Sequence, residues 1–176
     1  TSTNTYSLGC GSPVDDHIQF RVWTDGTVRL IIREGTTYYN APGSTVVTTG
    51  NWTHVAFVKD GTNVTMYVNG VADGTTAITQ VPVSMTDFVI GARSWRGSPT
   101  STNLFIGTMD EVRIWNSSRT AAEISNNMNT PLGGAESGLA AYYVFEDGNS
   151  VNPVTDQTIN GHDVTFTSAP TIISGF

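Results

Sequence analysis

Two strand-like runs that meet at an Asp-Gly pair constrain the fold of this chain most. Residues 52–59 and 64–68 are rich in Val, Phe, Met and Tyr, and they flank the letters DGTN. Asp and Gly tolerate the positive φ angles that a tight reversal between antiparallel strands requires. The same arrangement occurs upstream, where residues 18–23 and 28–33 flank TDGT. The sequence therefore predicts successive antiparallel hairpins.

Further turn and strand signals extend this pattern along the chain. Asn69-Gly70 and Asp73-Gly74 are expected to form the next two reversals. Short apolar or alternating runs predict four later strands, at residues 88–90, 105–115, 139–145 and 164–166. A chain of 176 residues is long enough for one domain with a sizeable core. We expect one all-β domain over residues 1–176.

One helix is predicted within this β-rich chain, at residues 119–128. Ser118 or Thr120 can serve as its N-cap, and Glu123 is placed to complete a capping box with Thr120. Pro131 and the Gly133-Gly134 pair follow and end the helical pattern.

The charge balance limits the partners of the protein. Fifteen acidic residues against eight basic ones give a net charge of -7, which repels phosphate backbones and anionic lipid surfaces. We therefore expect no nucleic acid binding, and because no transmembrane run is visible we expect no membrane insertion. No Lys or Arg follows Arg119, whereas six acidic residues do. Such a segment attracts cations, and Ca²⁺ above all.

Several motifs in a fixed order resemble the bacterial laminin-G-like family of concanavalin A-type jelly rolls. They are WxHVA at 52–56, YVNG at 67–70, IG at 90–91, GxxDEVRIW at 107–115, RTAAEI at 119–124, GLAAYYVFEDG at 138–148 and VTDQTINGHDV at 154–164. Their order and spacing make a chance match improbable. The resemblance implies an antiparallel β-sandwich jelly roll with one short helix.

The opening of the chain departs from the family pattern. Members usually begin with one or two strands that carry an FxxExW-type core motif, and the polar opening TSTNTYSLGC has no such segment. A sheet without its first strand would expose unpaired backbone groups. We therefore expect either self-association or a strand donated by a partner chain.

A calcium site is predicted in the C-terminal loop. Asp156, Asn160 and Asp163 offer hard oxygen ligands at short spacing, and Asp110 and Glu111 could join them from another strand. The resemblance implies the same, because jelly rolls of this kind often carry a structural calcium. The alternative is that the aspartates only cap turns.

A ligand platform is predicted at Trp95, which Arg93 and Arg96 flank in the loop ARSWRGSPTSTN. An exposed indole stacks on sugar faces, and Arg supplies planar hydrogen-bond donors. The alternative is that Trp95 folds back over the sheet. Trp52 and Trp115 lie in strand patterns, and we expect both to be buried and to bind no ligand.

No catalytic motif is visible. Glycoside hydrolases of this fold place two carboxylates on one strand face, whereas Asp110 and Glu111 are adjacent and would point to opposite faces. We therefore expect no enzymatic activity, with a glycan-active enzyme as the lesser alternative.

The function expected from these observations is that of a calcium-stabilised binding or adhesion module of an extracellular bacterial protein. It would contact a carbohydrate or a surface protein through its loops. A polar surface rich in Thr, Ser, Asn and Gly is typical of secreted or cell-surface proteins. Two alternatives remain open: a subunit or repeat of a surface filament or adhesin completed by a neighbour's strand, and a spacer domain.

Overall fold

The chain consists of two compact units in the computed structural model. Unit 1 contains Thr1–Ile106 and Thr120–Met128, and unit 2 contains Gly107–Arg119 and Asn129–Phe176. The structure describes residues 17–80, 88–92, 104–146 and 153–166, and the backbone alone of 6–11, 94–95 and 98–99. The expectation of one domain over the whole chain stays a prediction.

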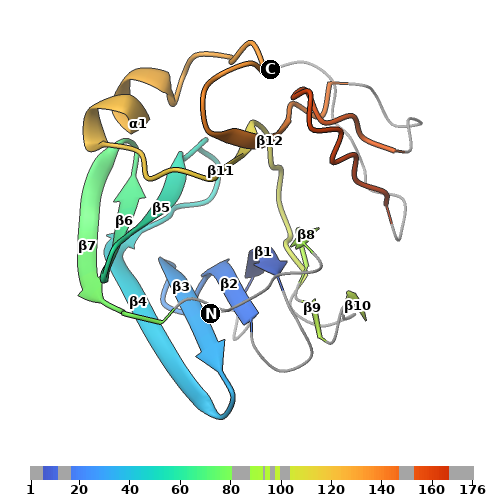
Figure 1. Cartoon of the computed structure of the whole chain (residues 1–176). Helices are drawn as coiled ribbons and strands as arrows, with labels where there is room; N and C mark the ends of the chain where they lie inside the picture. Colours follow the sequence, from blue (N-terminus) through green and yellow to red (C-terminus); the bar gives the residue numbers. More distant parts are fainter. Residues whose placement is uncertain are drawn as a thin grey trace. The chain divides into compact units, whose positions relative to one another are not determined.

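Antiparallel sheets form the framework of the described part of unit 1 (Figure 1). The larger sheet has the order β4-β3-β2-β1-β8, with β1 at Tyr6–Gly11, β2 at His17–Val22, β3 at Thr27–Glu34, β4 at Thr37–Val46 and β8 at Phe88–Ile90. The second has the order β5-β6-β7, with β5 at Val55–Asp60, β6 at Asn63–Val68 and β7 at Val71–Ala77. A two-residue ladder joins β9 (Ser94–Trp95) to β10 (Ser98–Pro99).

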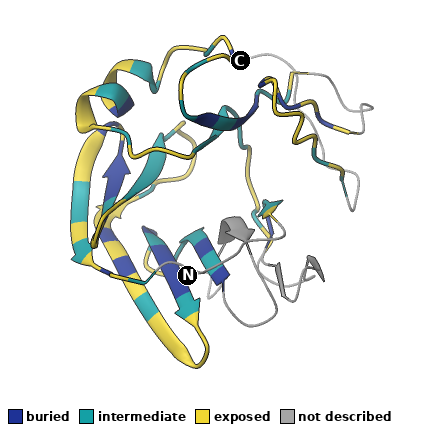
Figure 2. Cartoon of the chain, in the orientation of Figure 1, coloured by how far each residue is buried: buried dark blue, intermediate teal, exposed yellow. Residues whose placement is uncertain are grey.

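The core of unit 1 lies between these two sheets. Its fully buried members alternate along β3, β4 and β6, as the pleat of a strand requires: Val28, Leu30, Ile32, Ala41, Val64 and Met66, together with Ile78. Phe20 of β2 meets Phe57 of β5 edge to face, with ring centroids 5.2 Å apart. Figure 2 shows the buried residues of β3 and β6 in dark blue. The predicted all-β sandwich is confirmed.

Both predicted Asp-Gly hairpins are confirmed. The pair β2 and β3 turns at Gly26, and the pair β5 and β6 turns at Gly61, with φ of +83° and +52° respectively. A residue with a Cβ would be strained at such angles. The turn residues therefore set the register that places Leu30 and Val64 in the core.

The prediction of a reversal at Asp73-Gly74 is wrong. Both residues lie inside β7, where the register against β6 shifts, so the extra residue forms a β-bulge. The Asp73 carboxylate accepts hydrogen bonds from the backbone N–H groups of Ser44 and Thr45 and from both hydroxyls. A Cβ on Gly43 would overlap this carboxylate. The bulge thus turns Asp73 onto β4 and links the two sheets.

The opening forms a strand that was not recognised in the sequence, whereas the absence of the family's first strand stays a prediction. Tyr6–Gly11 forms β1, which pairs with β2 on one side and with β8 on the other. The opening thus contributes a strand of its own to the sheet, and a strand-donating partner or self-association stays a prediction. The signal was missed because the alternation of Tyr6, Leu8 and Cys10 is short and its intervening residues are Ser and Gly, and Gly is depleted in strands.

The predicted helix forms α1 at Ala121–Asn127, with Thr120 as N-cap. Its capping box is complete, because the Thr120 hydroxyl accepts from the Glu123 N–H and the Glu123 carboxylate accepts from the Thr120 N–H. No helix of the described residues is long and apolar enough to cross a membrane.

Unit 2 is built on one antiparallel pair, β11 (Val112–Trp115) and β12 (Leu139–Tyr143). The expected strand at 105–115 is shorter than predicted because Glu111 has φ of +55°, outside the extended region. The last predicted strand, at 164–166, is reduced to a single bridge between Val154 and Val164.

Candidate functional site

The Asp156 carboxylate organises the loop of residues 156–163 in unit 2, here called the 156–163 loop. Its Oδ1 accepts from the backbone N–H groups of Tyr142 and Thr158, at 3.0 and 2.9 Å. Its Oδ2 accepts from the Thr158 hydroxyl and the His162 N–H, at 2.8 and 3.0 Å. Asp156 is only 4% exposed. One buried carboxylate thus holds both ends of the loop against β12.

These hydrogen bonds also determine the charge state of Asp156. Burial is the largest single influence and raises the pKa, but the donors of Thr158, Tyr142 and His162 together outweigh it and lower the pKa below the ordinary value of 3.8. Asp156 is therefore ionised at neutral pH, as a carboxylate with four donors should be.

Other residues fasten the loop along its length. The Asn160 amide nitrogen donates to the Ala140 carbonyl at 3.0 Å, and the Tyr143 hydroxyl donates to the His162 carbonyl at 2.6 Å. Asp163 Oδ1 accepts from the Asp156 N–H at 2.9 Å. The loop is therefore a rigid platform, although most of its side chains are exposed.

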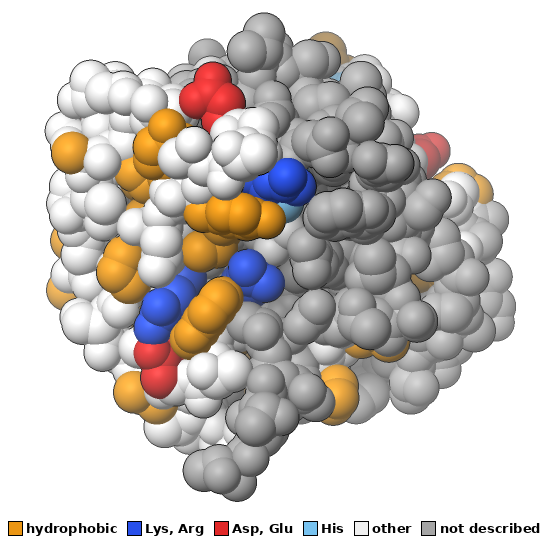
Figure 3. Space-filling view, turned by 90° about the horizontal axis from the view of Figure 1, so that it is seen from below, with side chains coloured by type: hydrophobic (Ala, Val, Ile, Leu, Met, Phe, Trp, Pro, Cys, Tyr) orange, Lys and Arg blue, Asp and Glu red, His pale blue; other side chains and the backbone are white. Residues whose placement is uncertain are grey.

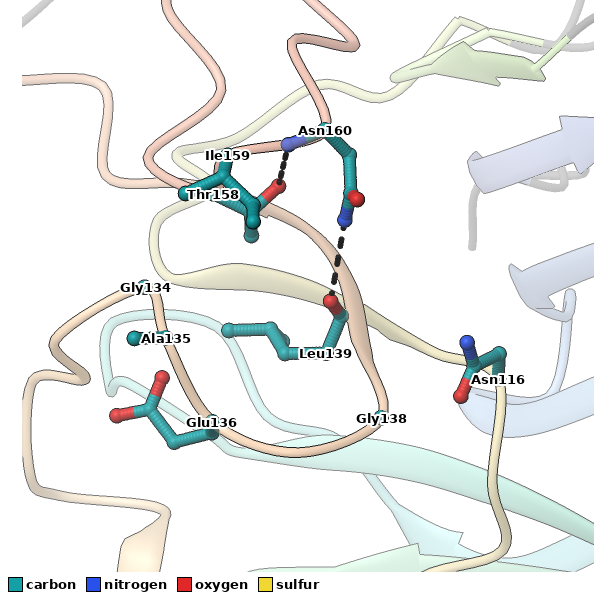
Figure 4. Close-up of a pocket in the computed structure, with 9 residues that line it drawn as sticks. All are labelled: Asn116, Gly134, Ala135, Glu136, Gly138, Leu139, Thr158, Ile159 and Asn160. Carbon is teal, nitrogen blue, oxygen red and sulfur yellow. Dashed lines mark hydrogen bonds between the residues drawn. The ribbon is translucent and has the colours of Figure 1, made fainter.

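A cavity of about 280 Å³ lies beside this platform and is here called the three-loop pocket (Figure 4). Three segments that are distant in the sequence line it: Asn116, Gly134–Leu139 (through Ala135, Glu136 and Gly138) and Thr158–Asn160. Glycines let these segments approach one another. A Cβ on Gly134 would overlap the Gln157 carbonyl oxygen, and one on Gly138 would overlap the Ser117 hydroxyl.

The lining of the three-loop pocket contains polar and apolar groups in similar amounts, and the polar ones are capable of hydrogen bonding. Asn116 is an exposed residue with a side-chain amide. Asn160 contributes the amide whose nitrogen also donates to the Ala140 carbonyl of β12. Glu136 Oε1 accepts from the Gly133 N–H at 2.8 Å, whereas its Oε2 is buried and has no hydrogen-bond partner among the described residues. Backbone donors, that of Gly133 first, lower the pKa of Glu136, so this carboxylate is ionised at neutral pH. Ile159 is 97% exposed at the rim.

Such a pocket can hold a small polar ligand through amide donors and carboxylate acceptors. It offers an apolar contact at Ile159 as well. The sequence interpretation named Asn160 but missed Asn116, Glu136 and Ile159. The available signal was the Gly133-Gly134 pair with Gly138, because clustered glycines mark places where backbones meet closely.

The residues predicted to bind calcium are engaged in other contacts. Glu111 accepts hydrogen bonds from the Tyr142 hydroxyl at 2.8 Å and pairs with Arg113. Asp110 Oδ1 accepts from the Glu111 N–H, and burial, the largest influence, raises the Asp110 pKa. Among the described residues, no group of three or more His, Cys, Asp and Glu side chains is placed to hold a metal ion.

Asp156 fits calcium poorly in this arrangement, because donors from the protein already occupy both carboxylate oxygens. The turn-capping alternative accounts for all the hydrogen bonds observed at Asp156 and for the one at Asp163. Calcium binding at this loop stays a prediction.

The predicted ligand platform lies outside the residues that can be described. Arg93 and Arg96 are among the undescribed positions, and Trp95 is described only by its backbone in β9. Its role stays a prediction.

The expectation for Trp52 is wrong, since this residue is 52% exposed. The physical reason is that β5 begins at Val55, so Trp52 precedes the pleated region that points side chains into the core. Trp115 is half-buried in β11, and the Arg119 guanidinium covers its ring at 4.2 Å from the centroid.

The fold defines an antiparallel β-sandwich of the jelly-roll class. The chain belongs to the concanavalin A-like lectin/glucanases superfamily, whose family model matches residues 2–125. A comparison with curated proteins found no match.

Solved structures with this fold come from several organisms. A protein of Bacteroides ovatus, provisionally named as carbohydrate-binding, is similar with a TM-score of 0.70 and 23% identity over 92% of this chain and 47% of its own. The CBM40 of a Ruminococcus gnavus IT-sialidase is similar with a TM-score of 0.59 and 16% identity, over 72% of this chain and 76% of its own. The present chain thus spans about half the length of the Bacteroides protein. At these identities the likeness concerns the fold.

Proposed function

We propose that this chain is a non-catalytic glycan-binding module of an extracellular bacterial protein, and that the three-loop pocket holds a sugar. The observation that carries the proposal is the lining of this pocket, which offers amide donors and a carboxylate beside apolar side chains, in a chain of the concanavalin A-like superfamily. Two structural neighbours support it, since their names describe a carbohydrate-binding protein and a carbohydrate-binding module. Attachment to a glycan surface is the corresponding biological role.

The chemistry of the three-loop pocket suits the hydroxyl groups of a sugar. Each hydroxyl can donate one hydrogen bond and accept others, and the lining offers both kinds of partner in the Asn116 amide and the Glu136 carboxylate. A volume of about 280 Å³ lies at the lower limit of typical ligand pockets, so one or two sugar rings is the appropriate size.

The non-catalytic part of this proposal is supported by the hydrogen bonds and ion pairs that already engage the carboxylates. Glu111 is held by Tyr142 and Arg113, and Asp156 by four donors. A glycosidase needs two carboxylates that face one substrate about 5 to 10 Å apart. Glu136 is the only carboxylate among the described residues that line the three-loop pocket, so it would bind rather than react.

A glycan array with the wild type and the Asn116→Ala variant tests the proposal. We expect the wild type to bind a defined set of glycans and the variant to bind them about three to ten times more weakly, as the loss of a hydrogen bond implies. Asn63→Ala, an exposed Asn of β6 in unit 1, is the matched control and should bind like the wild type. The proposal fails if no glycan is retained, or if both variants bind equally. Release of sugar from a bound glycan would refute the non-catalytic part.

A further inference from the structure

The side-chain amide of Asn116 is available to a ligand of the three-loop pocket. Its backbone N–H donates to the Gly138 carbonyl at 2.9 Å, which holds the residue beside the pocket. Asn116 is exposed, and no hydrogen bond joins its side chain to another residue in the described part of the chain. Gly138 leaves room for the amide, because an added Cβ would lie 3.2 Å from Asn116 Oδ1. The Asn116 amide therefore offers a donor and an acceptor side by side.

The Asn160 amide is oriented to accept from a ligand. Its nitrogen donates to the carbonyls of Ala140 at 3.0 Å and of Leu139 at 3.4 Å (Figure 4). Both partners are acceptors, so the amide nitrogen lies on that side and Oδ1 is left for other contacts. The ionised carboxylate of Glu136 is a second acceptor in the lining. A ligand therefore has to bring N–H or O–H donors to these two residues.

Apolar side chains line the same pocket. Leu139 is buried, whereas Ala135 and Ile159 are exposed. A methyl group of a ligand that contacts them would be removed from water, which favours binding. A hydroxyl in the same place would gain no such contact. The pocket thus suits a ligand that carries a small apolar group beside its polar ones.

The unit that contains the pocket is strongly acidic. Seven of the fifteen acidic residues but only two of the eight basic ones belong to unit 2, which gives it a net charge of -5. Both basic residues are engaged, because Arg113 pairs with Glu111 and Arg119 covers the ring of Trp115. Figure 3 likewise shows Lys or Arg side chains beside hydrophobic and acidic ones on one face of the molecule. No Lys, Arg or His is among the described residues that line the three-loop pocket, so an anionic ligand is disfavoured there.

We propose that the three-loop pocket binds an uncharged sugar that carries an acetamido group, in preference to sugars with a hydroxyl in its place and to acidic sugars. The N–H and C=O of the acetamido group can form two hydrogen bonds with the Asn116 amide. Its methyl can contact Leu139 and Ile159, and the ring hydroxyls can donate to Asn160 and Glu136.

This inference rests on the proposed glycan-binding function and names the class of sugar that the same pocket takes. Two of the three segments of the pocket, 134–139 and 158–160, lie outside residues 2–125, which the family model matches. The superfamily match therefore does not determine this specificity. It follows from the side chains of the pocket.

Isothermal titration calorimetry with two matched trisaccharides tests the inference. The β-1,4-linked trimers of N-acetylglucosamine and of glucose differ only in the acetamido group that replaces one hydroxyl of each ring. We expect the wild type to bind the acetamido trimer at least about ten times more tightly. Asn116→Ala should reduce this ratio to below about three, because the pairing amide is removed. Asn63→Ala, in unit 1, should leave the ratio unchanged.

Glu136→Gln tests the exclusion of acidic sugars. The variant removes the charge but keeps an acceptor for the Gly133 N–H. The probe is a glucuronic acid trimer, in which a carboxylate replaces the hydroxymethyl group of each glucose ring. We expect the wild type to bind it at least about ten times more weakly than the glucose trimer, and Glu136→Gln to bind it at least about three times more tightly than the wild type does. Glu34→Gln is the control, because it removes the same charge from the exposed end of β3.

The outcomes separate this inference from the proposed function. Equal binding of the acetamido and glucose trimers, lost in Asn116→Ala, would overturn the inference and leave the glycan-binding function in place. Equal effects of Glu136→Gln and Glu34→Gln would overturn the exclusion of acidic sugars, and thermal melting of each variant shows that the fold is retained. If neither trimer binds and a glycan array that includes the corresponding galactose pair is also empty, the proposed function itself is wrong.

Discussion

The Asp156→Asn substitution provides a direct test of how the candidate site is held together. Asn has nearly the same shape as Asp, but one of its terminal atoms is an NH₂ group that cannot accept hydrogen bonds. Two of the four bonds to residue 156 would therefore be lost, and donor would face donor. Bonds to a charged group contribute about 1.5 to 3 kcal/mol each. We expect the free energy of unfolding to fall by about 3 to 5 kcal/mol.

The pH dependence of this effect follows from the lowered pKa of Asp156. Its pKa is below 3.8 in the folded protein, so its carboxylate contributes stability at pH values above that ordinary value. The contribution is lost as the pH falls through the folded-state pKa. The difference in stability between wild type and Asp156→Asn should therefore be full at pH 7 and shrink as the solution is acidified below pH 4.

Urea denaturation followed by tryptophan fluorescence measures the loss, and Asp163→Asn is the matched control. The control makes the same chemical change in the same loop, but Asp163 accepts one hydrogen bond through one oxygen, which Asn retains. We expect the control to lose less than about 1 kcal/mol. Equal losses from the two variants would show that Asp156 does not organise the loop.

Three further predictions concern single residues. Gly134→Ala should lower the free energy of unfolding by more than about 2 kcal/mol, because φ is +82° and the added Cβ would overlap the Gln157 carbonyl oxygen. Gly161→Ala, where the added Cβ meets open space, should lower it by about 1 kcal/mol in the same urea denaturation assay. Trp52→Ala should lose less than about 2 kcal/mol and Leu30→Ala about 3 to 5 kcal/mol; equal losses would contradict their burial. If Asp163 and its loop bind calcium, adding Ca²⁺ after EDTA should stabilise the protein by about 2.7 kcal/mol at a hundredfold excess over Kd. An unchanged melting temperature would exclude such a site.

Local sequence signals were sufficient to predict the hairpins and the helix. The φ angles at Gly26 and Gly61 and the capping box of Thr120 with Glu123 depend on residues a few positions apart. Such interactions are visible in the sequence because the partners are neighbours in it. The family motifs added the sandwich architecture, which no local signal specifies.

Features that depend on distant partners were not predictable in this way. β1 is defined by its pairing with β2 and β8, and its short alternation of Tyr6, Leu8 and Cys10 with Ser and Gly is only a weak strand signal. The bulge at Asp73 depends on donors from Ser44 and Thr45, almost thirty positions upstream. The three-loop pocket likewise needs three segments to meet, and the glycines at 133, 134 and 138 indicate a close approach of backbones without indicating which segments approach.

The aspartates explain why an acidic composition is a weak guide to metal binding in this chain. Asp25, Asp73 and Asp156 each accept several hydrogen bonds from backbone N–H groups and hydroxyls, and these bonds lower the pKa of all three. Each holds a different junction: a hairpin turn, the link between β4 and β7, and the 156–163 loop. A sandwich rich in turns leaves many backbone donors without strand partners, and ionised carboxylates satisfy several of them at once. An excess of acidic residues therefore serves the loops of this fold, and the ligand sites have to be sought where polar groups remain unpaired, as at Glu136 in the three-loop pocket.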